Sequence, residues 1–151
     1  MGGVFLKTVI VYYTFGGATK KEAEKLAAQM GCEAVRVQEK KKRNLFSAFI
    51  PGAPWAMKRK ASDIQPLGVD LADYERIVIG APIWAGYPAP AFNAIVKLLP
   101  RGKDVDLFLC SGGGETPESS MGTRKLIQDA GCTVASYRDV NTGEKPAKLK
   151  T

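Results

Sequence analysis

A loop of small residues follows the first apolar stretch of the chain, and its composition is typical of a phosphate-binding turn. It consists of Thr14, Phe15, Gly16, Gly17, Ala18 and Thr19, and a helix-forming stretch begins at Lys20. Small side chains allow backbone N–H groups to close around an anion, and a helix N-terminus adds partial positive charge. The pattern GxxxxGK[ST] of nucleotide triphosphate loops is absent, so the loop favours a monophosphate. A glycine-rich turn without any ligand is the alternative interpretation.

A second loop presents aromatic side chains among glycines and prolines. Its candidate binding residues are Pro82, Ile83, Trp84, Ala85 and Gly86, with Tyr87 next in the chain. The indole of Trp84 offers a flat apolar surface for an aromatic ring system, and Gly86 permits close approach of the backbone. A tryptophan in a loop also serves as packing, which is the alternative.

A third loop has little side chain and many exposed backbone amides. It contains Ser111, Gly112, Gly113, Gly114 and Glu115. Such amides can donate hydrogen bonds to the polar edge of a ring, and these hydrogen bonds tune the electronics of a redox cofactor. A flexible turn explains the three glycines equally well.

Alternating strands and helices are expected to bring these loops together. Apolar and β-branched runs predict strands at 8–13, 34–37, 76–80, 105–110 and 132–137, and helical spacing predicts helices at 20–30, 89–99 and 119–130. This alternation is typical of an α/β fold with an open parallel sheet of five strands, order 2-1-3-4-5, and helices on both faces. All three loops then lie at the carboxyl ends of strands near the point where strand order reverses.

Two segments fit this scheme less regularly. Residues 39–68 combine a charge run with a Pro-Gly-Ala-Pro break, which predicts an irregular crossover or lid with one or two short helices. Residues 141–151 form a polar tail, too short and proline-interrupted for a covering helix, so the last helix is expected to be missing. One sheet face, beside the helix at 20–30, is then covered by this tail or by a second chain.

Composition narrows the classes of function. The 151 residues predict a single domain, and 22 basic against 15 acidic residues give a formal charge of +7, which favours acidic partners. No nucleic-acid module is visible. Histidine is absent, which excludes histidine-dependent triads and imidazole metal ligands. Cys32, Cys110 and Cys132 have neither disulfide-framework nor metal-site spacing, which fits a reducing cytoplasm. No membrane span or signal peptide is expected.

The three loops together resemble those of the flavodoxin family. The resemblance rests on YTFGGATK at 13–20, GAPIWAG at 80–86 followed by PAPAFNAI, and SGGGE at 111–115. It implies a bound FMN, with its phosphate at residues 14–19, its isoalloxazine against Trp84 and its polar edge along residues 111–115. It also implies that the Ala85–Gly86 backbone lies near the redox-active nitrogen. Gly16 and Ala18 replace a Thr and an Asn of the family pattern, which predicts weaker binding of the phosphate.

The leading hypothesis is therefore an FMN-binding redox protein that carries electrons between a reductase and an acceptor, with no catalytic side chain and no metal. One alternative is an NAD(P)H-dependent FMN or quinone reductase on the same fold, in which basic residues at 40–43 and 58–60 meet a dinucleotide phosphate. The other is a flavin-free module that binds an anionic partner through its basic surface. A homodimer through the uncovered sheet face is a further expectation.

Overall fold

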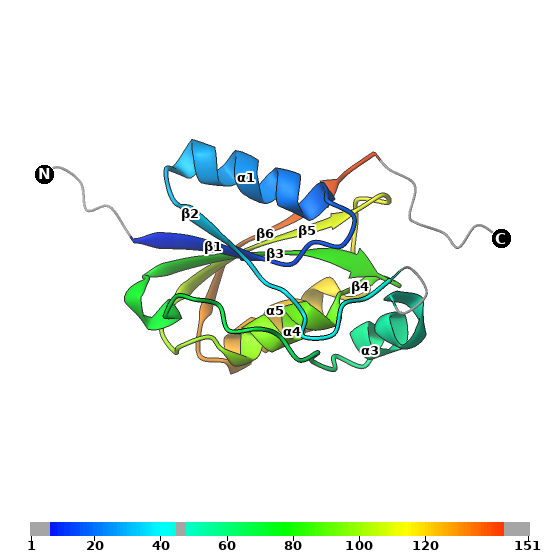
Figure 1. Ribbon diagram of the computed structural model, residues 1–151. Coiled ribbons are helices and arrows are strands. Elements are labelled where there is room, and N and C mark those ends of the chain that lie inside the picture. Colours follow the sequence, from blue (N-terminus) through cyan, green and yellow to red (C-terminus); the bar gives the residue numbers. More distant parts are fainter. Residues whose placement is uncertain (1–6, 45–47, 144–151) are drawn as a thin grey trace, which may run out of the picture.

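The computed structural model describes residues 7–44 and 48–143. Its centre is a parallel sheet with the strand order β2-β1-β3-β5-β6 (Figure 1). The strands are β1 (Thr8–Tyr12), β2 (Glu33–Arg36), β3 (Arg76–Trp84), β5 (Asp104–Ser111) and β6 (Thr133–Asn141). A two-residue strand, β4 (Tyr87–Pro88), pairs antiparallel with the end of β3. Without β4, this is the predicted order 2-1-3-4-5, so the predicted fold class is confirmed.

The three central strands form because their residues are β-branched or otherwise apolar on both faces. Val9, Ile10 and Val11 of β1 have no solvent exposure, and β1 pairs in parallel with both β2 and β3. Every residue of the edge strand β6 is at least partly exposed to solvent. The parallel pairing of β3 with both β1 and β5 places the carboxyl ends of these three strands side by side.

Helices cover the sheet unequally (Figure 1). The helix α1 (Ala18–Met30) lies alone on one face, and it begins after Gly17 and ends at Gly31, both with positive φ. On the other face lie α3 (Ala53–Met57), α4 (Pro90–Lys97) and α5 (Ser120–Asp129). The 3-10 turn η2 (Leu71–Asp73) leads into β3. Every helix within the described residues is too short or too polar for a transmembrane span.

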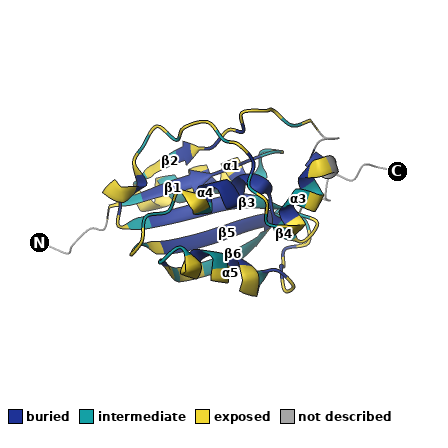
Figure 2. Ribbon diagram, turned by 90° about the horizontal axis from the view of Figure 1, so that it is seen from below, coloured by how far each residue is buried: buried dark blue, intermediate teal, exposed yellow. Residues whose placement is uncertain are grey.

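The main core lies between the sheet and the α4 and α5 layer (Figure 2). The deepest side chains there include Phe92 and Ile95 of α4, Ile127 of α5, and Ile77 and Ile79 of β3, all at 0% exposure. A smaller cluster lies under α1 and contains Ile10, Val78 and Phe108. The sequence-based expectation that one face carries only the helix after the first strand is therefore met by the described residues.

Two expectations about the irregular segments need correction. The stretch after Gly80 is not a loop, because β3 continues to Trp84 and returns through β4 as a tight hairpin. The segment around the Pro-Gly-Ala-Pro break has no sharp turn, because the π-helical turn η1 (Ala48–Gly52) leads directly into α3. Residues 45–47 and 144–151, which include most of the predicted tail, lie outside the described residues.

Candidate functional site

The first loop folds around the hydroxyl of Thr14, which is buried at 7% exposure. Its Oγ1 accepts hydrogen bonds from the N–H of Gly17, at 3.1 Å, and from the N–H of Lys20, at 3.3 Å. This hydroxyl therefore caps the start of α1 from outside the helix, and Gly17 itself adopts a left-handed φ of 102°. The loop is held in a tight turn without any ligand.

Two donors remain at the start of α1. The N–H groups of Ala18 and Thr19 belong to the first helical turn and form none of the backbone hydrogen bonds found among the described residues. They lie at the positive end of the helix dipole, with the exposed Lys20 next in the chain. This arrangement fits an anionic group such as a phosphate.

The second loop is the hairpin between β3 and β4. Trp84 pairs with Tyr87 across it, and the turn residues Ala85 and Gly86 have φ of 54° and 86°. Two consecutive positive φ values are typical of the two-residue turns that join tightly twisted strands. Ala85 is unusual there because left-handed backbone disfavours a side chain. The hairpin thus holds Trp84 on a strand rather than on a mobile loop.

Trp84 joins the first loop to the second. Its half-buried indole meets the ring of Phe15 edge-on at 5.6 Å between centroids, and it meets Tyr13 edge-on at 6.1 Å. Edge-to-face packing of this kind orients aromatic rings. The phosphate-type turn and the aromatic platform are therefore in direct contact.

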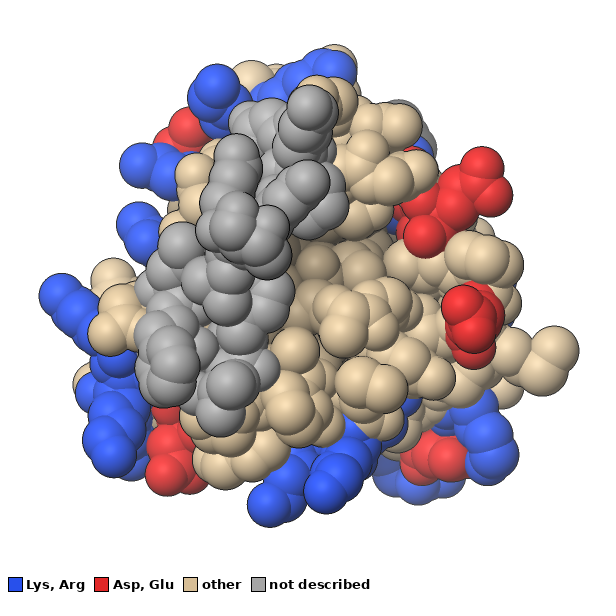
Figure 3. Space-filling view, turned by 90° about the vertical axis from the view of Figure 1, so that its right-hand side faces the viewer, with Lys and Arg blue, Asp and Glu red and all other residues tan. Residues whose placement is uncertain are grey.

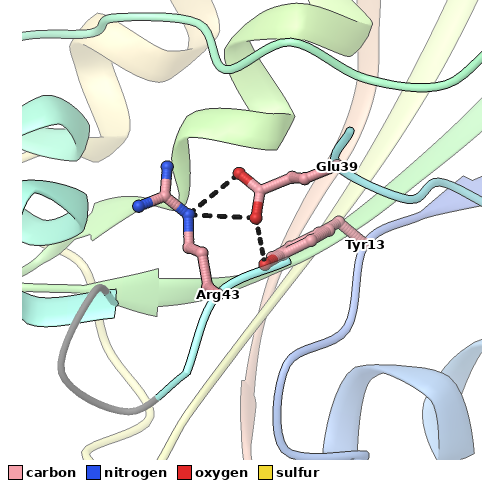
Figure 4. Close-up of polar contacts among 3 residues, drawn as sticks. All are labelled: Tyr13, Glu39 and Arg43. Carbon is pink, nitrogen blue, oxygen red and sulfur yellow. Dashed lines mark hydrogen bonds and ion pairs between the residues drawn. The ribbon is translucent and has the colours of Figure 1, made fainter. Parts of the chain in front are cut away.

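A buried ion pair lies beside this platform (Figure 4). Glu39, only 8% exposed, accepts a hydrogen bond from the Tyr13 hydroxyl at 2.7 Å, and Arg43 Nε donates to both carboxylate oxygens at 2.9 and 3.0 Å. Burial, and then the bond to Glu39, raise the pKa of Tyr13 well above its usual range. The phenol therefore stays protonated and donates to the carboxylate throughout the neutral range.

The same Arg43 links the platform to α3. Its guanidinium carbon lies 5.5 Å from the centre of the Trp84 ring and 5.8 Å from that of Trp55 on α3. A guanidinium near two aromatic rings is held by cation–π attraction. The segment that contains α3 is thereby fastened to the hairpin.

The third loop is anchored to β6 rather than to the platform. The N–H of Gly114 donates to Ser111 Oγ at 2.8 Å, and Gly114 cannot carry a side chain because a Cβ would lie 2.8 Å from Asn141. Thr116 donates to the Asp139 carboxylate through both its N–H and its hydroxyl, and the hydroxyl also meets Tyr137. Burial raises the pKa of that tyrosine. Since Pro82 pairs with Cys110, the loop begins directly beside the base of the hairpin.

A second arginine, Arg59, supports the hairpin from the side of α5. It donates to Thr123 Oγ1 at 2.7 Å and to the carbonyl oxygen of Ser119 at 3.0 Å, and it lies 4.9 Å from the Tyr87 ring centre. Burial lowers its pKa. Its backbone φ of 58° is left-handed, which packing must hold in place.

The predicted site residues thus fall into two groups. Those of the first two loops are brought into contact, through Phe15 and Trp84 above all. Those of the third loop adjoin the hairpin through β5. Sequence reasoning missed several residues that fix the site from behind, namely Tyr13, Glu39, Trp55, Thr116, Tyr137 and Asp139. Arg43 and Arg59 lie in the basic runs 40–43 and 58–60, which the reductase alternative assigns to a dinucleotide phosphate, whereas the structure packs them against Trp84 and Tyr87 of the hairpin.

On the surface onto which β3 and β5 end, the described residues at the centre are largely uncharged (Figure 3). Among the described residues, Lys and Arg side chains gather towards its edge. No group of three or more metal-ligating side chains occurs in the described part of the chain. The uncharged centre, together with the donors at the start of α1, fits a ligand with a planar ring system and an anionic end.

Comparisons with solved structures agree with the fold. A flavoprotein from Lactobacillus acidophilus NCFM, in complex with FMN, matches with a TM-score of 0.74 and 26% identity over 89% of this chain and 93% of its own. A protein from Bacteroides eggerthii matches with a TM-score of 0.76 and 22% identity, over 93% of this chain and 91% of its own. A WrbA-like flavodoxin from Agrobacterium tumefaciens matches with a TM-score of 0.58 and 16% identity, over 85% of this chain and 75% of its own. The fold is flavodoxin-like, and the resemblance noted in the sequence is confirmed.

No protein-family model matches the sequence, and no curated protein matches it either.

Proposed function

We propose that this flavodoxin-like chain binds FMN at the carboxyl ends of β1, β3 and β5 and carries electrons between a reductase and an acceptor. The observation that carries the proposal is the contact between Phe15 and Trp84. It joins a turn suited to a phosphate to a flat aromatic surface suited to a ring system. The FMN complex of the Lactobacillus flavoprotein supports the same ligand.

The three loops have separate roles in this proposal. Residues 14–19 hold the phosphate, Trp84 faces the isoalloxazine, and the amides of residues 111–115 donate to its polar edge. When bound, FMN supplies the electron-transfer chemistry. The chain orients the group and limits the access of water, and no acid–base side chain is required.

The first loop has room for the cofactor's anionic end. The N–H groups of Ala18 and Thr19 can donate to it, and a Cβ built at Gly16 would meet nothing within 4 Å. That space stands where the family pattern has a threonine. The loop therefore accepts a phosphate with fewer side-chain contacts, and we expect FMN to bind more weakly than in chains with the full pattern.

The surface around the site supports transfer to a protein partner. The described residues at its centre carry few charges, and its edge carries Lys and Arg side chains together with some Asp and Glu side chains (Figure 3). A partner with acidic residues around its own redox centre would be drawn to this edge, and complementary charge mainly accelerates such encounters.

A reductase that uses NAD(P)H is the second candidate, because basic side chains line a cleft beside the first loop. Mixing the FMN-loaded protein with NADPH or NADH, with no other protein present, separates the two candidates. Rapid bleaching of the flavin absorbance would favour the reductase, and a stable spectrum would favour the carrier.

Titration of the flavin-free protein with FMN, followed by quenching of flavin fluorescence, tests the binding itself. Trp84→Ala should weaken binding by about 5- to 100-fold, since stacking on an aromatic ring contributes about 1–3 kcal/mol. Trp84→Phe keeps a ring and should retain most of the affinity. The pair Gly16→Thr and Ala18→Asn should strengthen binding. No binding by the parent chain, and no gain from this pair, would favour the flavin-free module instead.

A further inference from the structure

A polar cleft of about 360 Å³ lies on the β2 side of the first loop. Its walls come from the end of β1, from the first loop, and from the segment that follows β2; the lining includes Thr14, Phe15, Arg36, Gln38 and Lys42. Its volume falls within the range of small-molecule sites. The proposed FMN site does not account for this cleft, because it lies beyond β1 from β3 and β5.

The cleft carries surplus positive charge. Arg36 and Lys42 are exposed, and neither forms an ion pair with any described carboxylate. The acidic group in the lining is Glu39, whose charge is paired with that of Arg43 and whose carboxylate also accepts a hydrogen bond from the Tyr13 hydroxyl. The side chains of Arg36 and Lys42 are therefore two cations at the cleft, unpaired among the described residues, beside the buried ion pair of Glu39 and Arg43.

The other lining groups are suited to a nucleoside. Gln38 is exposed and its side-chain amide offers both a donor and an acceptor. Phe15 is half-buried and presents an aromatic ring at the boundary with the first loop. Cations for phosphate, an amide for polar edges and an aromatic ring together match a nucleotide better than an inorganic anion.

We propose that this cleft binds the adenosine phosphate half of a dinucleotide. Because Thr14 and Phe15 belong to both the cleft and the first loop, a second phosphate can continue from one into the other. The ligand has two possible sources with this shared chemistry. One is FAD, which adds an adenosine phosphate to FMN, and the other is NAD(P)H. Because Thr14 and Phe15 also belong to the proposed FMN site, binding of FAD rests on the proposed function, whereas binding of 5′-AMP or 2′,5′-ADP can be measured without FMN.

Calorimetry on the flavin-free full chain tests this proposal by measuring the affinity for 5′-AMP and for 2′,5′-ADP at low ionic strength. The affinities for FAD and for FMN are measured in the same way and compared. Arg36→Ala and Lys42→Ala should each weaken the adenosine ligand by about tenfold or more, as expected for hydrogen bonds to a charged group. Lys40→Ala is the matched control, because Lys40 is exposed in the same basic run and does not line the cleft. All three positions are at the surface, so thermal unfolding should be unchanged.

Each outcome decides the question. Tighter binding of FAD than of FMN, reduced by Arg36→Ala and by Lys42→Ala but not by Lys40→Ala, identifies FAD as the source. Binding of 2′,5′-ADP to FMN-loaded protein, weakened by the same variant, identifies the nicotinamide dinucleotide. The proposal is overturned if FAD and FMN bind equally and neither probe binds at millimolar concentration, or if Lys40→Ala weakens binding as much. Failure of FMN alone, with 2′,5′-ADP still bound, would count only against the proposed function.

Discussion

The two faces of the sheet are covered in different ways. On one face, α4 and α5 bury a continuous apolar surface that includes Val105, Leu107 and Leu109 of β5 (Figures 1 and 2). On the other face, the intervening β5 residues are Asp106, Phe108 and Cys110, and α1 is the only described helix. The same strand is thus apolar towards one layer and mixed towards the other.

Side chains complete the second face where a helix is lacking. Arg76 binds the Asp106 carboxylate through two nitrogens, and Ser136 Oγ donates to the same carboxylate. Arg138 lies over the Phe108 ring at 5.9 Å and pairs with Glu22 of α1 at 2.8 Å. A shallow cavity of about 150 Å³ remains between these groups and α1. Charged side chains can therefore shield an apolar sheet with their stems while their heads stay in water.

The largest expected effect lies on the helix-covered face. Phe92→Ala should reduce the free energy of unfolding by about 3–5 kcal/mol, because Phe92 is fully buried and its surroundings cannot collapse. Phe108→Ala removes an equally buried ring on the second face, where flexible arginines and the cavity allow relaxation, so its cost should be smaller. Urea unfolding of both variants measures the difference. Equal losses would mean that the two faces are packed alike.

Gly80→Ala should have the next largest effect, on the second face. A Cβ at Gly80 would lie 2.0 Å from Phe108 Cζ, which forces the ring to move and costs about 1–3 kcal/mol. Adding Phe108→Leu should recover much of this loss. Gly16→Ala is the control, since nothing lies within 4 Å of its Cβ. A similar loss in this control would argue against the clash, because alanine at an unobstructed glycine lowers the entropy of the unfolded chain and should by itself stabilise the fold.

The sequence was sufficient to predict the order of the five main strands and the positions of the first and third loops. Val9 to Val11 and Ile77 to Ile79 are apolar runs of strand length, and Gly31 marks the end of α1, so local patterns located these elements. The strand order then placed the first three loops at one end. These inferences succeeded because each depends on local residue types and on general rules of topology.

The side chains behind the site could not be predicted in the same way. Glu39 stands in the run EKKKRN, which is typical of a solvated surface, yet it is buried by Tyr13, 26 residues away, and by Arg43. The close contact of Gly80 with Phe108 also joins distant positions. Likewise, β3 continues through Pro82 because Pro82 pairs with Cys110 of β5 and the next two residues pair with β4, which overrides the usual meaning of a proline. Pairings between distant residues decide these features.

Asp106→Ala should have a smaller effect than the two core changes. Arg76 and Ser136 would lose their shared acceptor, and hydrogen bonds to a charged group contribute about 1.5–3 kcal/mol each at most. Since the Arg76 side chain is 38% exposed, water can replace part of the lost hydrogen bonding. We therefore expect the free energy of unfolding to decrease by an amount near the lower end of this range. Thermal unfolding measures it. The additional change Arg76→Ala should then cost little, whereas a full further loss would show that the two residues act independently.

Arg138→Ala should have the smallest effect on stability, since an exposed ion pair contributes about 0–1 kcal/mol and is screened by salt. Substitution of Arg138 is nevertheless the sharpest test of what covers the second face, because its guanidinium lies over the Phe108 ring. Sedimentation across a range of concentrations compares the parent chain with Arg138→Leu. If the arginine keeps this face exposed to solvent, the parent chain should remain monomeric and the Arg138→Leu variant should associate. If instead a second copy normally covers the face, the parent should already dimerise, and the loss of Arg138 should change the dimer rather than create it.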